Sequence, residues 1–358
     1  MIKIVHIIGR LTYGGAEKLL LDLCQKINKE KFAVSVVVLQ SDNPLAEQFQ
    51  KAGIKLKFFE KENRWDWGIV NRLAEYLQEQ NPDIVHTHLF AGDFWGYWAC
   101  RKAKIKKTIS TKHDILKESF CRDRLGPFCR RRFTKIVAIS RATRDYLFRV
   151  EKIETQKVEV IYNGVDVEKF YDPQTKIFKK DELMIGCVGR LAKEKGQKHL
   201  LRACRFLPFA DWRLLLVGDG PKRKELELLA ENLGIRHKVH FSGNVDDVRP
   251  FLKVLDVFVL PSVSEGLSLV ILEAALAGKV VVASRVGGVP EIVTDKQNGL
   301  LFTPKKAEEL VRHLTWVHEN KEKAVLLAED LRETVKNNFS LQRTVEHYQS
   351  LYENIANK

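Results

Sequence analysis

Several features that define other protein classes are missing from this 358-residue sequence. No apolar run approaches the roughly 20 residues that a membrane-spanning helix needs. The opening apolar run leads straight into a glycine turn without a cleavage site, so we expect no signal peptide. The six cysteines are scattered without a Cys-x-x-Cys pair, which favours reduced thiols in a cytoplasmic protein and disfavours a zinc site.

Two motifs of phosphate chemistry are also missing. The sequence contains no Asp-x-Asp, which argues against a divalent metal clamped on a diphosphate, so we expect neither a metal nor another cofactor. It contains no Gly-x-Gly-x-x-Gly either, which disfavours a nicotinamide dehydrogenase.

Acidic residues are scarce in one part of the chain. The net charge is +14, and residues 101–149 carry sixteen Lys and Arg against four Asp and Glu. One interpretation is a solvated basic face. The other is contact with an anionic partner, such as a phosphorylated or lipid acceptor, a membrane surface or nucleic acid. Because no zinc or helix-turn-helix signature appears, a nucleic-acid-binding protein is the weaker alternative.

Short apolar runs alternate with helical patterns twice along the chain. Continuous apolar strands between helices are typical of parallel sheets covered on both faces, so we predict two doubly wound α/β domains. The polar segment 168–181 separates them, and the expected boundaries are 1–168, 169–338 and a final helix in 339–358. Predicted strands are 2–8, 33–39, 83–88, 106–113, 134–140, 158–166, 183–190, 212–220, 239–243, 257–262 and 280–284, and predicted helices include 16–28, 71–80, 197–207 and 221–234.

The stretch PSVSEGLSLVILEAALAG, residues 261–278, places two carboxylates after an apolar strand. Glu273 lies inside an apolar helix, where an unpaired carboxylate is costly, and Glu265 precedes it by eight positions. Glu273 suits vicinal hydroxyls such as those of ribose, and Glu265 lies nearer the reacting end of a ligand. The alternatives are a helix-terminal charge for Glu265 and a paired core carboxylate for Glu273. The helix start offers free amides to an anion, at Leu267, Ser268 and Leu269.

Two further loops follow strands. GRLAKEKGQ places Arg190 and Lys195 five residues apart, which suits the two-point binding of a diphosphate, although either alone reads as a solvated cation. Gly14 and Gly15 precede a helix and permit close approach of an anion to the backbone; the alternative is an ordinary glycine turn.

Histidines form a third group. His86 and His88 lie two apart on a predicted strand and share one face, and His113 ends another strand beside Asp114. A zinc pair or a general base is conceivable, but packed, hydrogen-bonded histidines are the more common outcome.

Taken together and in order, these motifs resemble those of the retaining glycosyltransferases of family 4. The resemblance covers nearly the whole length and adds IYNGVD, LLLVGDGP, FSGNV, GGVPEIV and NGLLF. It implies a GT-B fold, with two Rossmann-like domains facing each other across a deep cleft. The first would bind the acceptor and the second a nucleotide-sugar donor, with UDP-sugar favoured over GDP-sugar. The final helix would pack back on the first domain.

The resemblance also implies roles for single residues. Arg190 and Lys195 would hold the donor diphosphate, Glu273 the ribose, and Glu265 the transferred sugar. His113 would contact the sugar or line the acceptor side. Ser268 departs from the glycine of many members, which matters little because its amide is the contact. The other donor-binding positions would be Gly14, Gly15, Gly218, Phe241, Asn244, Gly266, Leu267 and Leu269.

The implied reaction is a metal-independent transfer with retention at the anomeric carbon, in lipopolysaccharide or other cell-envelope glycan assembly. Domain closure would exclude water. The acceptor would be a glycan or glycolipid, and the enzyme would be cytoplasmic or peripheral on the inner face of the membrane. An aromatic group beside the basic region would contact the bilayer: Trp65, Trp67, Phe90, Phe94, Trp95, Tyr97 and Trp98. A soluble acceptor and an exposed helix are the alternative. A GT-B sugar-nucleotide 2-epimerase is the rival function, but the carboxylate cluster that it would need at the sugar C2 is not evident.

Overall fold

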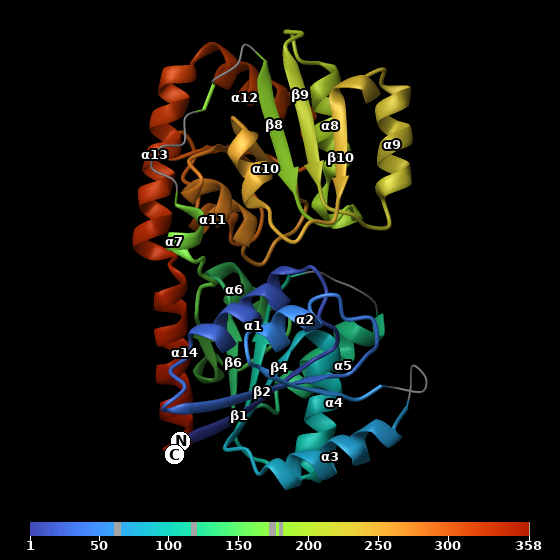
Figure 1. The fold of residues 1–358 in the computed structure, drawn as a ribbon, viewed down its shortest axis with the longest axis vertical. Coiled ribbons are helices and arrows are strands. Elements are labelled where there is room, and N and C mark those ends of the chain that lie inside the picture. The colour runs from blue at the N-terminus through green and yellow to red at the C-terminus, as the bar shows by residue number, and fades with distance from the viewer. Residues whose placement is uncertain (61–65, 116–119, 172–176, 179–181, 358) are drawn as a thin grey trace. The chain divides into compact units, whose positions relative to one another are not determined.

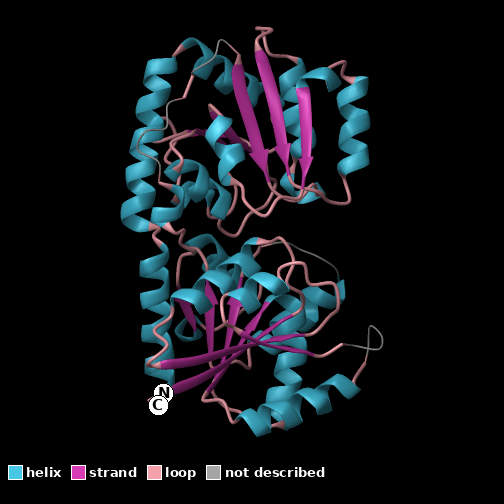
Figure 2. Ribbon diagram, viewed as in Figure 1, coloured by secondary structure: helices cyan, strands magenta, loops and turns pink. Residues whose placement is uncertain are grey.

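The computed structural model describes residues 1–60, 66–115, 120–171, 177–178 and 182–357. The chain divides into two compact units (Figure 1). Unit 1 comprises Met1–Asn163 and Leu341–Lys358, and unit 2 comprises Gly164–Ser340. In both units, helices flank the strands (Figure 2). Within the described residues, no helix combines the length and the apolar character needed to span a membrane.

In its described part, unit 1 contains a seven-stranded parallel sheet with the order β3-β2-β1-β4-β5-β6-β7. Its apolar strands are buried, as the continuous hydrophobic runs predict. The strands are β1 (Ile2–Ile8), β2 (Phe32–Val38), β3 (Lys55–Phe58), β4 (Ile84–His88), β5 (Thr108–Lys112), β6 (Lys135–Ala138) and β7 (Val158–Val160). The helices are α1 (Gly15–Lys26), α2 (Ala46–Lys51), α3 (Gly68–Gln80), α4 (Leu89–Lys102), α5 (Phe120–Arg130), α6 (Arg141–Arg149) and α14 (Leu341–Ala356), with the short 3-10 helix η1 (Thr155–Lys157).

Helix α4 packs unusually close to this sheet because two glycines face it. A Cβ on Gly92 would lie 2.4 Å from the carbonyl oxygen of Ile7, and one on Gly96 would lie 2.7 Å from Cγ2 of Thr87. Since real Cβ atoms do not come so near to backbone, only glycine permits this approach at position 92. The close packing brings Asp93, the residue after Gly92, against the strands.

Helix α14 completes the core of unit 1 from the far end of the sequence. Its Tyr348, Leu351 and Tyr352 are buried in one cluster with Ile4 of β1 and Ile84 of β4. The helix therefore covers one face of the central strands, which are too apolar to be left in water.

Unit 2 contains, in its described part, a six-stranded parallel sheet with the order β10-β9-β8-β11-β12-β13. The strands are β8 (Leu183–Val188), β9 (Trp212–Val217), β10 (Val239–Gly243), β11 (Val257–Leu260), β12 (Val280–Ser284) and β13 (Leu300–Phe302). The helices are α7 (Val167–Phe170), α8 (Gln197–Arg205), α9 (Arg223–Asn232), α10 (Arg249–Val254), α11 (Leu269–Leu276), α12 (Ala307–Glu319) and α13 (Lys321–Asn338), with the 3-10 turns η2 (Lys193–Lys195), η3 (Arg236–Lys238) and η4 (Val289–Glu291).

The two doubly wound α/β domains predicted from the sequence are confirmed. The first segment of unit 1 ends at Asn163, before the expected polar linker 168–181. That segment begins with α7 of unit 2, and its residues 172–176 and 179–181 lie outside the described part of the chain.

Candidate functional site

The loop after β8 is held against the loop after β11, its neighbour in the sheet of unit 2. Gly196 adopts a φ of 68°, and a Cβ there would lie 2.1 Å from the carbonyl oxygen of Pro261. The amide of Val263 donates to the carbonyl oxygen of Glu194 at 2.8 Å. Both contacts bring the predicted cations to the start of the predicted carboxylate segment.

Lys195 and Glu265 meet directly at this point. The Lys195 ammonium donates to Oε1 of Glu265 at 2.8 Å, and the Ser262 hydroxyl donates to the same oxygen at 2.6 Å. Glu265 is 8% exposed, so its negative charge is stabilised by an ion pair and a hydrogen bond rather than by water. The Ser284 hydroxyl in turn donates to the Ser262 carbonyl, which ties the site to β12.

Arg190 is held far more loosely than Lys195. Its side chain is 60% exposed and donates to Glu194, four residues later. Exposed ion pairs of this kind contribute about 0–1 kcal/mol, so the guanidinium can exchange this partner for an anion at little cost. The structure therefore places both predicted cations beside one loop but gives only Lys195 a fixed position.

Helix α11 begins in the same segment. Ser268 is its N-cap, with extended backbone and without a capping bond from its side chain. The Ser268 hydroxyl is buried and has no hydrogen-bond partner among the described residues. Because the helix begins at Leu269, the amide of Leu267 precedes the cap, and Val270 contributes a first-turn amide that was not predicted from the sequence.

Glu273 lies in the middle of α11 and is 3% exposed, as predicted for a carboxylate inside an apolar helix. The preceding turn is also fixed, since the amide of Gly288 donates to the carbonyl oxygen of Gly266 at 3.1 Å. The GGVPEIV turn thus supports the segment that carries both glutamates.

The three positions expected near a nucleotide base lie around the ends of β9 and β10. Gly218 has a φ of 128°, and a Cβ there would lie 2.3 Å from the Gly189 carbonyl, so this strand end must be glycine. Asn244 accepts a hydrogen bond from the amide of Asp219 at 3.0 Å. Phe241 is instead packed in the hydrophobic core, with Arg236 over its ring at 5.4 Å, and this placement favours a packing role over stacking on a base.

The glycine loop of unit 1 places Gly14 at the N-cap of α1 and Gly15 at its first turn. A carboxylate, Glu17, already occupies this first turn and is 6% exposed. The Thr12 hydroxyl donates to Glu17 at 2.9 Å. Part of the positive end of the helix dipole is therefore balanced before any ligand binds.

Four histidines of unit 1 pack together, and His6 was not predicted among them. His6 and His88 are joined at 3.0 Å, and His88 and His113 at 3.1 Å. His86 contacts the Tyr352 hydroxyl at 2.8 Å and the Thr111 hydroxyl at 2.7 Å through its two ring nitrogens. The one sequence signal for His6 is weak: it is a polar residue within an apolar run, and the structure places it in register with His86.

Burial keeps these imidazoles neutral near pH 7. It lowers the pKa of His6 to about 3 and the pKa of His113 to about 4. It also lowers the pKa of His86 and His88 well below the usual value. Nitrogen atoms of His6, His86 and His88 lie within 4.8 Å of one another, which is a spacing that metal sites share. Both nitrogens of His86 are nevertheless engaged in hydrogen bonds, so the packed interpretation fits these residues better.

A pocket of about 270 Å³ opens beside His113. It combines charged side chains of both signs with apolar ones. The lining residues are Leu89, Phe90, Asp93, Thr111, Lys112, His113, Asp114, Arg122, Asp123, Pro127, Arg130, Tyr146, Val150 and Glu151.

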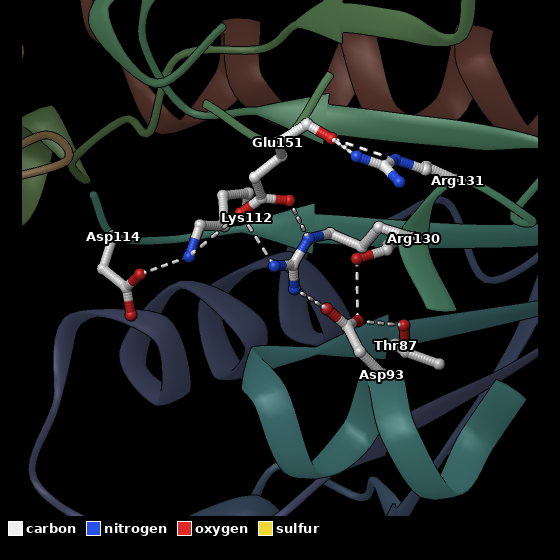
Figure 3. A network of polar contacts seen from close by, with 8 residues as sticks. Thr87, Asp93, Lys112, Asp114, Arg130, Arg131 and Glu151 are labelled. Carbon is white, nitrogen blue, oxygen red and sulfur yellow. Dashed lines mark hydrogen bonds and ion pairs between the residues drawn. The ribbon is translucent and has the colours of Figure 1, made fainter. Parts of the chain in front are cut away.

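Three of these lining residues, Asp93, Arg130 and Glu151, belong to one buried ion network (Figure 3). Arg130 donates to Asp93 at 2.6 Å and to both oxygens of Glu151 at 2.7 and 2.8 Å. Asp93 also accepts from the hydroxyls of Thr87 and Ser110. All five residues are buried, so the network joins α4, α5, β4, β5 and the turn after α6 in the interior of unit 1.

The aromatic group next to the basic region is mostly core, which corrects the expectation that it forms a membrane-contacting surface. Phe94, Trp95 and Tyr97 are buried in the cluster between α4 and the sheet. Trp67 is 50% exposed and packs edge-on against Trp95 and Trp98. Trp65 lies outside the described residues.

Comparison with known proteins shows the family of the chain. Residues 169–337 match the family model described as glycosyl transferases group 1, and residues 13–169 match the model of glycosyltransferase family 4. The chain belongs to these glycosyltransferases. It is 25% identical, over 98% of its length and 96% of the relative's, to the UDP-Gal:alpha-D-GlcNAc-diphosphoundecaprenol alpha-1,3-galactosyltransferase of Escherichia coli.

This glycosyltransferase is also similar to a second curated relative and to a solved structure. It is 36% identical to the lipopolysaccharide core biosynthesis glycosyltransferase LpsE of Rhizobium meliloti, over 48% of this chain and 50% of LpsE. Its fold matches that of Anabaena Alr3699/HepE in complex with UDP-glucose, with a TM-score of 0.91 at 24% identity, covering 99% of this chain and 100% of HepE. The fold is thus GT-B, as the sequence predicted.

Proposed function

We propose that this glycosyltransferase moves a hexosyl group from a UDP-sugar to a glycan or glycolipid acceptor of the cell envelope. The observation that carries the proposal is the Lys195–Glu265 ion pair, which lies beside the N-terminus of α11 at the ends of two neighbouring strands. The named Escherichia coli relative supports a UDP-sugar donor and a lipid diphosphate acceptor, and LpsE supports lipopolysaccharide assembly. HepE supports UDP-glucose as the kind of donor bound.

The diphosphate is the group that these residues suit best. An ammonium has three donors, so Lys195 can keep its bond to Glu265 while it donates to a phosphate oxygen. Arg190 adds a mobile guanidinium, and the amides at the start of α11 add a helix N-terminus. Together these groups stabilise the charge that develops on the leaving diphosphate, and we propose that they do so without a metal.

In this proposal the two glutamates bind the uncharged parts of the donor, which are the ribose and the transferred sugar. Glu273 accepts from the ribose hydroxyls, and Glu265 contacts the sugar next to the diphosphate that Lys195 holds. The acceptor then attacks the anomeric carbon from the same face as the departing diphosphate, and the configuration at that carbon is retained. Gly14, Gly15, Gly218 and Asn244 remain donor-binding proposals.

The acceptor is assigned to the pocket of unit 1. Its apolar wall, with Leu89 and Phe90, suits a sugar ring or a lipid-linked carrier. Its cations Lys112 and Arg122 suit a phosphate of such a carrier. We further propose that the enzyme works at the inner face of the cytoplasmic membrane, where a lipid-linked acceptor would be found.

A donor screen and two variants test the proposal. UDP should raise the melting temperature of the protein more than GDP or ADP does, because only a bound nucleotide stabilises the folded state. Arg190→Ala or Lys195→Ala should lower transfer from the UDP-sugar by two to three orders of magnitude, about 3–4 kcal/mol.

Lys193→Ala is the matched control, because Lys193 is exposed in the same loop. Wild-type turnover in both site variants would show that neither cation takes part in the transfer. An epimerised sugar formed from donor alone, without acceptor, would instead establish the 2-epimerase.

A further inference from the structure

The first strand of each unit is followed by the same tripeptide. Gly-Arg-Leu follows β1 at residues 9–11, and Gly-Arg-Leu follows β8 at residues 189–191. In its sheet β1 lies between β2 and β4, and β8 lies between β9 and β11. The strand order reverses beside each of these strands, and in open α/β sheets ligands bind beyond the carboxyl ends of the strands at such a switch point. The two arginines therefore hold equivalent places in the two units.

The local structure around the two tripeptides agrees as well. Leu11 is 0% exposed and Leu191 is 1% exposed, so each leucine anchors its loop in a core. The arginine before each of them is exposed. A glycine is the N-cap of the helix that follows, Gly14 for α1 and Gly196 for α8. The repeated sequence thus corresponds to a repeated loop structure.

Arg10 differs from Arg190 in having no partner. Arg190 donates to Glu194, whereas Arg10 has neither an ion pair nor a hydrogen bond within the described part of the chain. A single exposed arginine is common on protein surfaces, and what distinguishes Arg10 is its place at the switch point of unit 1. Its planar guanidinium carries five N–H donors in a fork that fits a phosphate. Arg10 is therefore available to an anionic ligand at this edge of the sheet.

The backbone beside Arg10 contacts the helix that lines the pocket of unit 1. A Cβ on Gly9 would lie 3.0 Å from that of Ala91, which follows Phe90 of the pocket lining. On the other side of Arg10, the amide of Leu11 donates to an asparagine side chain at 2.8 Å. These two contacts fix the place of the Arg10 backbone next to α4.

Two of the cations that line the pocket are already paired with carboxylates. Lys112 donates to Asp114 at 2.6 Å and lies 3.9 Å from Glu151. Arg130 is buried and donates to two carboxylates of the ion network. A phosphate at this edge of the sheet therefore gains more from the unpaired Arg10 than from these two side chains.

We propose that Arg10 binds a phosphate of the acceptor in unit 1 and so selects a phosphorylated acceptor over a neutral one. The phosphate belongs to a lipid diphosphate or to a phosphorylated soluble glycan, since the guanidinium contacts only the phosphate oxygens. The assignment rests on the proposed function for the presence of an acceptor in unit 1. It gives Arg10 the role in unit 1 that Arg190 has toward the donor diphosphate in unit 2.

Calorimetry with octyl diphosphate in the presence of saturating UDP tests this site. UDP fills the donor site, so an octyl diphosphate that still binds occupies another one. We expect the wild type to bind it, and Arg10→Gln to weaken the binding about tenfold or more, because a charged hydrogen-bond donor is lost. Lys29→Gln is the matched control and should bind as the wild type does, since it removes the same charge in the exposed turn before β2, at the opposite edge of the sheet.

Three results would overturn the proposal. The first is no binding of octyl diphosphate to the wild type in the presence of UDP, and the second is equal affinity in the wild type and Arg10→Gln. The third is a loss of UDP affinity in Arg10→Gln with octyl diphosphate binding intact, which would assign Arg10 to the donor. Because Arg10 is exposed, its replacement leaves the core of unit 1 in place.

Inorganic diphosphate and octyl glucoside distinguish the sources of the phosphate. Octyl glucoside carries the chain without a phosphate and should not compete with octyl diphosphate. Competition by inorganic diphosphate at equal concentration supports a soluble phosphorylated glycan, and much weaker competition supports a lipid diphosphate. Competition by octyl glucoside alone would show that the chain and not the phosphate is bound, against the proposal.

Failure of the donor proposal would be seen separately. If UDP does not bind the wild type, the donor assignment fails, and octyl diphosphate is titrated without it. A loss of affinity in Arg10→Gln but not in Arg190→Gln would then still support the phosphate site of unit 1. A loss in Arg190→Gln alone would overturn it.

Discussion

Glu265 and Glu273 differ in what surrounds their carboxylates. Glu265 shares its oxygen with Lys195 and Ser262 in the loop, whereas Glu273 lies one and a half turns into an apolar helix. Both were predicted from the sequence to belong to one site, because burying an unpaired carboxylate in an apolar helix is costly and therefore indicates a functional role. The sequence did not predict the contact between Lys195 and Glu265, which lie 70 residues apart and meet only because Gly196 passes close to Pro261.

Isosteric replacement should separate the roles of the two glutamates. Glu273→Gln should weaken UDP binding roughly 10- to 100-fold, since hydrogen bonds to charged groups contribute about 1.5–3 kcal/mol. Glu265→Gln should leave UDP binding nearly unchanged and lower kcat about 100-fold, because it alters the contact with the transferred sugar. Calorimetry with UDP and steady-state rates measure the two effects, with Glu231→Gln on the exposed surface of α9 as the control. The division fails if both variants lose UDP binding equally.

At the scale of elements, α4 shows where sequence patterns mislead. Its aromatic content suggested an exposed, membrane-facing surface, yet the helix is apolar on most sides because it is buried. Gly92 and Gly96, which let α4 approach the sheet, form no motif that can be recognised in the sequence. The strands β3 and β13 were also missed: β3 is a short edge strand with alternating lysines, and β13 has three residues.

The ion network around Arg130 should dominate the stability of this region. Arg130→Met removes the cation that Asp93 and Glu151 share and leaves Glu151 with Lys112 at 3.9 Å; removing one partner of a buried pair costs about 3–5 kcal/mol. Urea denaturation followed by tryptophan fluorescence measures the loss in the free energy of unfolding. Arg149→Met, on the exposed end of α6, should change the free energy of unfolding by less than about 0.5 kcal/mol. Equal effects of the two variants would contradict the burial argument.

At the scale of the whole molecule, the excess of positive charge remains the reason to expect that the protein binds an anionic surface. Most basic side chains of the region 101–149 are exposed, whereas Arg130 is internal. With the aromatic side chains largely buried, attraction to a membrane has to be electrostatic, at about 1 kcal/mol for each basic residue near the surface.

The protein should therefore float with anionic vesicles at low salt and be released as salt rises, because screening removes this attraction. Replacing Lys102, Lys104 and Lys106 by Glu should abolish flotation. The same exchange at the exposed Lys224, Lys296 and Lys323 changes the net charge equally and should leave it intact. No flotation of the wild type at low salt, or equal loss in both triple variants, would reject the membrane contact.

The return of α14 to unit 1 has a consequence for how the polypeptide is made. Residues 1–163 leave the ribosome before all of unit 2, and the helix that covers their central strands leaves after it. Until then Ile4 and Ile84 lack the side chains of Tyr348 and Tyr352, and Nδ1 of His86 lacks the Tyr352 hydroxyl. Unit 2 is continuous in the chain and can finish folding as it emerges, so the half made first is the half completed last.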